Sequence, residues 1–356
     1  MGGVHVPRPK DFPSEPLHVV AIGGGTGLSV LLQGLKQYVP DHTVAATEPS
    51  CLDIAAVVTV TDDGGSSGRL RREFDVLPPG DIRNCLVALS EDEALLSRLF
   101  QYRFEAGRGL KGHSFGNLFL TALTHITGDF PEAVKESSDV LAIKGRIYPS
   151  TASNVTLEAV LDNGARLVGE TRISKSRRRI ETVRLRPRRC RPLPDTLAAI
   201  EHADLITLGP GSLFTSVIPN LLVGGIADAI RRSPAIKAYF VNLMWQPGET
   251  ARFKASDHIQ AIQRHGGAKL LDYAVLNTHP IKSSLRRRYA QEESMPVEND
   301  IDEITALGVA VVCGDLLQES KMVRHDPQSI AAIAMRLAME GRKRRKKIAA
   351  LESSSE

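Results

Sequence analysis

Runs of apolar residues alternate with amphipathic stretches along most of the chain. The run at residues 18–22 passes through a cluster of glycines into Leu28, Leu31, Leu32 and Leu35, a spacing of i, i+3, i+4 and i+7 that predicts a helix packed on a sheet. Later apolar runs are continuous, which is typical of parallel strands covered on both faces. They occupy residues 54–61, 204–209, 235–244, 272–278 and 308–317. Helices are predicted between and around them, at residues 78–89, 112–128, 130–143, 255–265 and 328–352.

Between residues 150 and 192 the pattern changes to that of strands alone. Two β-like runs flank Asp162-Asn163-Gly164, and an Asn-Gly pair between such runs predicts a tight hairpin. Strand–helix alternation on both sides of this small β insertion predicts an α/β fold with a doubly wound, mostly parallel, Rossmann-like sheet. We expect a flexible N-terminal arm at 1–16, a nucleotide-binding domain at 17–325, and a C-terminal helix with a basic tail at 326–356.

The composition is that of an ordinary globular protein, with 42% hydrophobic and 24% charged residues in a chain of 356. No run approaches the roughly 18 apolar residues of a membrane span, and the N-terminus lacks the apolar core of a secretory signal. The four cysteines are scattered without the spacing of a zinc site or a disulfide framework. A reducing, cytoplasmic setting is therefore expected.

The formal net charge of +4 comes from one short segment of the chain. Residues 342–347 are six consecutive Lys and Arg residues, which exceed the whole excess of positive charge. Such a run could contact nucleic acid or anionic lipid, although a solvated, partly helical tail is the simpler interpretation. The stretch at 172–191 is also basic. Because a nucleic-acid role for either segment rests on charge alone, nucleic acid is not an expected partner.

The first strand ends in the turn Gly23-Gly24-Gly25-Thr26-Gly27, at the edge of the sheet where such folds bind ligands. Glycine lets backbone N–H groups approach an anion closely, and the following helix adds the positive end of its dipole. The turn therefore predicts a phosphate or pyrophosphate site, with a tight turn that binds nothing as the alternative. Neither the P-loop pattern nor a clean dinucleotide fingerprint is present, which disfavours a nicotinamide-dependent oxidoreductase.

Two further strand-end turns carry polar side chains. Asp62 and Asp63 end the second strand, where acidic residues bind ribose hydroxyls or a divalent cation, unless they serve only the turn. Asp81, Arg83 and Asn84 lie together at the start of the next helix, where Asp81 could equally be an N-cap.

Three later stretches complete the candidate chemistry. His113 precedes a helix that begins near Ser114 and carries Asn117; it could act as an acid or base, or donate to a phosphate. Residues 209–216 repeat the order strand, glycines, hydroxyls, helix, which suggests a ligand with separated polar groups such as a nucleotide diphosphate bearing a further group. Trp245, the only tryptophan, could stack on that ligand or belong to the core.

Taken in order, six of these stretches resemble the YvcK/CofD-like family. Its branches include the gluconeogenesis factors (YvcK type) and the 2-phospho-L-lactate transferases (CofD type), and "TDDGGSSGRLRREF" and "GHSFGNL" look like the first branch. The matching stretches are 21–36, 57–74, 77–89, 112–123, 205–223 and 246–258. After Thr250 the family usually continues with an acidic and an aromatic residue, whereas this chain reads Ala251-Arg252-Phe253-Lys254.

The resemblance implies a protein that binds UDP-sugars, notably UDP-N-acetylglucosamine. It also implies a link to cell shape, to the cell envelope and to growth on gluconeogenic carbon sources, with protein partners and no well-defined reaction. The transferase branch implies instead the transfer of a phospholactyl group from a guanosine-diphosphate-linked donor to a deazaflavin, with Mg²⁺. A homodimer is a further expectation for such a fold.

The resemblance also implies a single cleft lined by the motifs described above. Residues near the diphosphate would be Gly24, Gly25, Thr26 and Gly27. Asp62 and Asp63 would lie near the sugar, the ribose or a metal. The remainder of the cleft would be lined by Asn84, His113, Asn117, Gly211 and Ser212. No residue is assigned a catalytic role.

Overall fold

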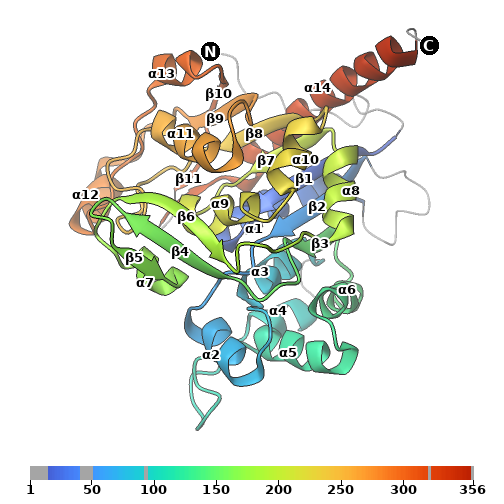
Figure 1. Cartoon of the computed structure of the whole chain (residues 1–356), viewed down its shortest axis with the longest axis vertical. Helices are drawn as coiled ribbons and strands as arrows, with labels where there is room; N and C mark the ends of the chain where they lie inside the picture. Colours follow the sequence, from blue (N-terminus) through green and yellow to red (C-terminus); the bar gives the residue numbers. More distant parts are fainter. Residues whose placement is uncertain (1–14, 41–50, 92–94, 320–321, 354–356) are drawn as a thin grey trace.

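A computed structural model describes residues 15–40, 51–91, 95–319 and 322–353; most of the predicted N-terminal arm lies outside these ranges. In the described chain, seven parallel strands form a central sheet of order β10-β9-β8-β7-β1-β2-β3 (Figure 1). These strands are β1 (Leu17–Gly23), β2 (Leu52–Val58), β3 (Arg146–Pro149), β7 (Leu205–Leu208), β8 (Ile236–Phe240), β9 (Tyr273–Asn277) and β10 (Ala310–Gly314). The predicted doubly wound fold is confirmed, because the strand order reverses direction between β1 and β7.

Helices cover both faces of this sheet (Figure 1). The apolar side of the first helix packs inward as its spacing predicts, since Leu28, Leu31, Leu32 and Leu35 are all fully buried. One face carries α1 (Gly25–Leu35), α3 (Gly80–Leu89) and α14 (Pro327–Ser353). The other face carries α8 (Pro194–His202), α9 (Ile218–Leu221), α10 (Ile226–Arg232) and α11 (Ala255–Gly266).

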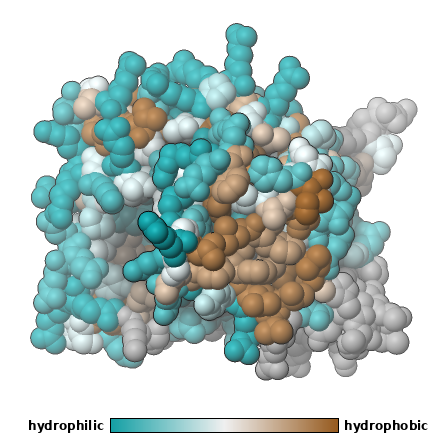
Figure 2. Space-filling view, turned by 90° about the horizontal axis from the view of Figure 1, so that it is seen from below, coloured by the Kyte–Doolittle hydropathy of each residue, from teal (hydrophilic) through white to brown (hydrophobic). Residues whose placement is uncertain are grey.

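Four helices between β2 and β3 form the lower end of the molecule (Figure 1). They are α2 (Gly65–Phe74), α4 (Leu95–Gln101), α5 (Phe115–Thr127) and α6 (Phe130–Val140). The predicted stop of α5 is confirmed: Gly128 follows it in the left-handed conformation, with φ of 74°. Exposed apolar side chains gather at this end, and Figure 2 shows an apolar area there. They include Phe74, Leu95, Leu96, Leu99, Tyr102, Ile126 and Val140.

The predicted β insertion is a separate antiparallel sheet of order β5-β4-β6. It comprises β4 (Thr156–Leu161), β5 (Arg166–Val168) and β6 (Ile180–Arg186), with the short α7 (Glu170–Ser174) between the last two. β4 and β5 pair on either side of the predicted turn, in which Gly164 has a φ of 78°. Glu158 is fully buried and pairs with both Arg184 and Arg186.

The remaining described elements, apart from a turn at Leu213–Val217 described below, follow α1, β9 or β10 in the chain or lead into β10. They are the 3-10 turn Lys36–Tyr38, α12 (Ser283–Gln291), α13 (Ile301–Ala306), and the antiparallel pair β11 (Leu317–Glu319) and β12 (Val323–His325). The last strand of the main sheet is β10, as predicted, but the β11–β12 hairpin that follows it was not predicted.

The basic run at residues 342–347 lies within α14, and the expectation of a solvated tail is wrong for Arg342. This side chain is buried, and its Nε and Nη2 atoms lie 2.8 Å from the two carboxylate oxygens of Asp204, which is also buried. A Cβ at Gly341 would lie 1.9 Å from the Asp204 carbonyl oxygen, so the helix can sit this close only because residue 341 is glycine. The start of the basic run is therefore part of the core.

None of the described helices is alone long and apolar enough to cross a membrane. One pair, Leu213–Leu221 with Ile226–Arg232, passes that test by length and composition, with a bend of 75° between its two parts.

Candidate functional site

The reversal of strand order brings two glycine-rich turns face to face. β1 enters α1 through Gly24 and Gly25, and β7 continues through residues 209–212 into a π-helical turn at Leu213–Val217. The Asn220 amide nitrogen ties the two turns together, because it donates to the carbonyl oxygens of Gly23 at 3.2 Å and Ser216 at 2.7 Å. The first and fifth motifs of the sequence therefore form one structural unit.

The two turns are in backbone contact at Gly27. A Cβ added there would lie 2.4 Å from the carbonyl oxygen of Pro210 and 2.8 Å from the Cα of Gly211. Gly25 has a φ of +64°, a conformation that glycine adopts without strain. Because these positions carry no side chain, the backbone at the start of α1 can approach an anion closely. The Gly25 N–H already interacts with the buried Asp81 carboxyl group, so a ligand would compete with Asp81 for this donor.

A cavity of about 350 Å³ opens between these turns. This volume lies within the range of small-molecule sites. Of the predicted site residues, Gly24, Gly25, Thr26, Gly27, Gly211 and Ser212 line it. Other lining residues are Val30, Pro210, Ser216, Asn242, Leu243, Met244, Gln246, Val323, Arg324 and His325. We call this cavity the switch-point cleft.

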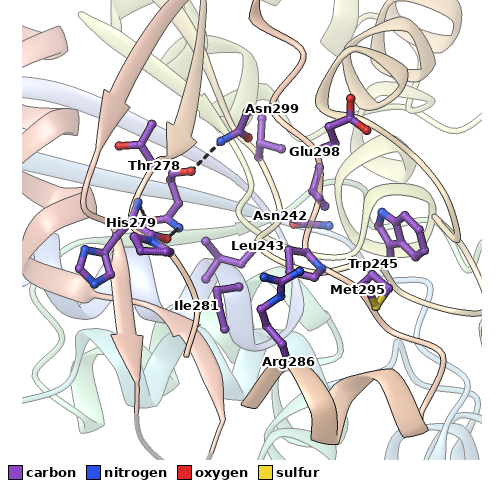
Figure 3. Close-up of a pocket in the computed structure, with 15 residues that line it drawn as sticks. Asn242, Leu243, Trp245, Thr278, His279, Ile281, Arg286, Met295, Glu298 and Asn299 are labelled. Atoms are coloured by element: carbon purple, nitrogen blue, oxygen red, sulfur yellow. Dashed lines mark hydrogen bonds between the residues drawn. The ribbon is translucent and has the colours of Figure 1, made fainter. Parts of the chain in front are cut away.

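A second cavity of about 400 Å³ adjoins the switch-point cleft and shares Asn242 and Leu243 with it. It lies beyond the carboxyl ends of β8 and β9, and in Figure 3 the Arg286 side chain reaches into it from α12. Its wall is braced by the Asn299 amide, which donates to the Asn277 carbonyl oxygen at 2.7 Å (Figure 3). The two cavities together offer room for a ligand longer than a diphosphate.

Asn242 lies where the two cavities meet, as Figure 3 shows for the second of them. Its side-chain oxygen, Oδ1, accepts a long hydrogen bond of 3.4 Å from the Gly211 N–H. Its buried amide nitrogen has no hydrogen-bond partner among the described residues. Because a buried donor without a partner costs free energy, this amide is a ready contact for a ligand.

The predicted acidic residues Asp62 and Asp63 line neither of these two cavities. Asp62 accepts a 2.8 Å hydrogen bond from the Gly64 N–H, and the Asp63 carboxylate accepts from the Thr171 N–H and hydroxyl at 2.8 and 2.6 Å. Asp63 thus anchors the β insertion to the main domain. Asp81 is closer to the diphosphate position, because a Cβ on Gly24 would lie 2.5 Å from its carboxylate oxygen.

Burial and the charge of Asp62 raise the pKa of Asp81 to about 7. Burial, together with the charge of Asp81, also raises the pKa of Glu170 well above its usual range. Even so, no group of three His, Cys, Asp or Glu residues in the described chain is arranged to hold a metal ion. Any Mg²⁺ would therefore depend on ligand phosphates for most of its contacts, as this ion often does.

Of the remaining predicted residues, His113 and Asn117 belong to a separate polar cluster between α2 and α5, whereas Asn84 lies on α3. The Nδ1 atom of His113 lies 2.9 Å from the Ser66 hydroxyl, and the Asn117 amide donates to the Ser67 hydroxyl at 3.3 Å. Burial, aided by the charge of Arg69, lowers the pKa of His113, so the ring is neutral near pH 7. Asn84, on α3, accepts a hydrogen bond from the Arg83 guanidinium. None of His113, Asn117 and Asn84 lines the two cavities described above.

Two basic residues near the cavities were missed by the sequence analysis. Arg324 lines the switch-point cleft from β12, and Arg286 lines the adjoining cavity from α12. Both lie outside the matching motifs. In the sequence, Arg324 lies in a short Val-Arg-His-Asp stretch beyond the last predicted strand. No sequence pattern indicates that this stretch contacts a glycine turn 300 residues earlier in the chain.

A parallel sheet with paired glycine turns at its switch point defines the class of Rossmann-like α/β proteins. Within that class, residues 19–317 match the family model described as 2-phospho-L-lactate transferase CofD. The chain belongs to the YvcK/CofD-like family, and its curated relatives are gluconeogenesis factors.

Two relatives and one solved structure illustrate the likeness. A putative gluconeogenesis factor from Nostoc sp. is 51% identical over 322 residues, which is 89% of this chain and 68% of that protein. The gluconeogenesis factor of Bacillus subtilis is 45% identical over 90% of this chain and 98% of its own length. A crystal structure of a protein from Bacillus halodurans matches with a TM-score of 0.85 at 45% identity, covering 90% of this chain and all of that one.

Proposed function

We propose that the chain is a regulatory protein that binds a UDP-sugar, UDP-N-acetylglucosamine, in the switch-point cleft. In this proposal it acts in growth on gluconeogenic carbon sources and in the control of cell shape and the cell envelope, through protein partners. The general role follows the gluconeogenesis factors to which the chain is related. The observation that carries the proposal is the backbone contact between the two glycine turns, which opens the start of α1 to a diphosphate.

Charge around the cleft supports this placement of the diphosphate. Arg324 is a lining cation that could pair with phosphate oxygens, and the glycine turn at the start of α1 lines the same space without side chains that would keep an anion away. Asp81, the carboxyl group nearest to Gly24, has a pKa raised to about 7, which reduces its repulsion of an anion near neutral pH.

The adjoining cavity supports a ligand with a group on each side of the diphosphate. Asn242 has a buried amide nitrogen free to donate at the junction, and Arg286, Asn277 and Thr278 supply polar contacts beyond it. A nucleotide sugar has that form, since its base and its sugar flank the diphosphate. A bare phosphate or pyrophosphate would leave this second cavity unused.

The proposal is tested by calorimetric titration of the protein with UDP-N-acetylglucosamine, with GDP as comparator, each with and without Mg²⁺. We expect UDP-selective binding that does not depend on Mg²⁺. Gly25→Val should abolish it, because a β-branched side chain is strained at a φ of +64° and covers the backbone donors. Gly128→Val is the matched control, because Gly128 also has a positive φ, 74°, but caps α5 away from the cleft. Equal affinities for wild type and Gly25→Val would contradict the placement.

A transferase of the CofD type is the second candidate, favoured by the family model and by the neighbouring carboxyl groups of Asp62 and Asp81. Those two carboxylates could share an Mg²⁺ with ligand phosphates, and the ion would supply charge stabilisation at the transferred group. In the titration above, a preference for GDP that requires Mg²⁺ would support this reaction over the regulatory role.

A further inference from the structure

The largest of the cavities described here, about 740 Å³, lies outside the switch-point cleft. Its walls are a loop of the β insertion, which carries Arg177, Arg178 and Arg179, and the segment 245–257, which carries Arg252. Trp245 and Phe253 supply aromatic surface. We call it the arginine pocket; it shares Trp245 and Met295 with the cavity of Figure 3 but no residue with the switch-point cleft.

Four arginines line this pocket against three acidic residues, and each of the three has a partner already. The buried Glu249 carboxylate accepts from the Phe214 N–H at 3.0 Å and from the Thr215 hydroxyl at 2.8 Å. Asp257 accepts from the Lys254 N–H at 2.8 Å at the start of α11, and Glu293 pairs with Arg177.

Two of the arginines lack a carboxylate partner. Among the described residues neither Arg179 nor Arg252 makes an ion pair, whereas Arg178 lies 3.6 Å from Asp162. Arg252 is exposed and lies at a φ of +65°. The cavity therefore has two guanidinium groups without an ion pair. A planar guanidinium can bind a carboxylate or phosphate group through two parallel hydrogen bonds.

The pocket is held in shape without a ligand. The guanidinium of Arg179 lies 5.6 Å from the centre of the Phe253 ring, and the Trp245 indole N–H donates to the Phe253 carbonyl oxygen at 2.9 Å. A Cβ at Gly248 would lie 1.7 Å from the Ser174 carbonyl oxygen, so the β insertion rests directly on the segment that carries Trp245 and Arg252. Pre-formed walls of this kind reduce the ordering cost of binding.

We propose that the arginine pocket binds a second ligand, a small organic anion with carboxylate or phosphate groups, separately from the nucleotide cleft. Its anionic groups contact Arg179 and Arg252, and its carbon skeleton packs against Trp245 and Phe253. The proposal does not depend on which nucleotide the switch-point cleft binds, because that cleft shares no lining residue with the arginine pocket. Only the adjoining cavity borders both sites, through Trp245 and Met295.

The sole tryptophan makes the test direct, since Trp245 lines the pocket and is the only residue of its kind in the chain. The intrinsic fluorescence of the full-length protein is followed during titration with citrate and, in a second arm, with pyrophosphate, at constant ionic strength. We expect a saturable change in at least one arm. A stronger response to citrate assigns a carboxylate ligand, and a stronger response to pyrophosphate assigns a phosphate ligand.

Four single variants locate the response. Arg179→Gln and Arg252→Gln should each weaken the apparent affinity by roughly tenfold, the loss expected for one charge-assisted contact. Arg189→Gln removes the same charge from an exposed position outside the pocket and should respond as wild type does. Arg286→Gln removes it from the adjoining cavity and tests whether the anion binds there instead. Thermal unfolding midpoints establish that all four variants fold.

Three outcomes would overturn the proposal. The first is the absence of a saturable change at millimolar anion. The second is an equal loss in Arg189→Gln, which would indicate general charge screening. The third is a loss in Arg286→Gln with none in Arg179→Gln, which would place the anion in the adjoining cavity. Failure of UDP-N-acetylglucosamine to bind would contradict the proposed function and would leave this result unaffected.

Discussion

Gly27 is the position at which a single methyl group tests the architecture of the switch-point cleft. In Gly27→Ala the new Cβ would lie 2.4 Å from the carbonyl oxygen and 2.6 Å from the carbonyl carbon of Pro210. These are backbone atoms of the facing turn, so no side-chain rotation relieves the contact. The two turns must move apart by several tenths of an ångström or more, and the cleft that they enclose changes shape.

The expected change in the free energy of unfolding has the opposite sign to that of an ordinary Gly→Ala substitution in a helix. Inside an exposed helix, replacement of Gly by Ala stabilises by about 1 kcal/mol, whereas overpacking of a closed contact costs about 1–3 kcal/mol. Because Gly27 is in the first turns of α1 and faces Pro210, we expect a net loss of about 1 kcal/mol in the free energy of unfolding. The affinity for UDP-N-acetylglucosamine should fall by about tenfold or more, equivalent to roughly 1.4 kcal/mol.

Gly23→Ala is the matched control, because its Cβ would meet Leu28 at 3.5 Å, an ordinary contact. We expect it to be as stable as wild type or slightly more stable, since alanine restricts the unfolded chain. Urea unfolding measures the stability of both variants, and calorimetry measures their affinity. If Gly27→Ala matched Gly23→Ala in both measurements, the close contact between the turns and its role in binding would be refuted.

Three further predictions concern charge. Arg342→Met should lower the free energy of unfolding by about 3 kcal/mol in urea titration, because it removes a partner of the buried Asp204; Arg344→Met, at an exposed pair, should cost about 1 kcal/mol at most. The folded-state pKa of Asp81, about 7, lies above its ordinary value of 3.8, so the folded state holds this proton more tightly and stability should fall as pH rises from about 4 to 7. Asp81→Asn should make urea midpoints across that range flatter, and an unchanged slope would contradict the assignment. Arg324→Gln should weaken UDP-N-acetylglucosamine binding and its salt dependence in calorimetry, whereas Arg287→Gln, outside the cleft lining, should change neither.

Local chemistry made much of the fold readable from the sequence. The Asn-Gly turn at residues 162–164, the continuous apolar runs of β1 and β2, and the terminating Gly128 each act through near neighbours in the chain. For the same reason the two glycine turns could be predicted as a candidate site; the structure shows that they line one cavity, and ligand binding there stays a prediction.

The rest depends on contacts that no local pattern encodes. Arg342 lies in a run of six basic residues, and nothing in that run indicates that its first member pairs with Asp204 in the core. Arg324 reaches the switch-point cleft through a short hairpin, and Asp63 serves a loop of the β insertion 108 residues further along the chain. Their positions follow from tertiary packing, and sequence spacing alone gave them no distinguishing mark.

The order in which the polypeptide is synthesised bears on when the switch-point cleft can exist. The walls of this cleft come from residues 24–30, 210–216, 242–246 and 323–325. On one side β1 pairs with β7, and the His18 N–H of β1 donates to Asp204, which lies 186 residues later in the chain. A nascent chain that has left the ribosome only as far as the β insertion has the first glycine turn but lacks the surface against which it packs. Ligand therefore cannot assist the early steps of folding. If the proposed ligand binds in this cleft, binding becomes possible only late in translation, once the hairpin that carries Arg324 has emerged.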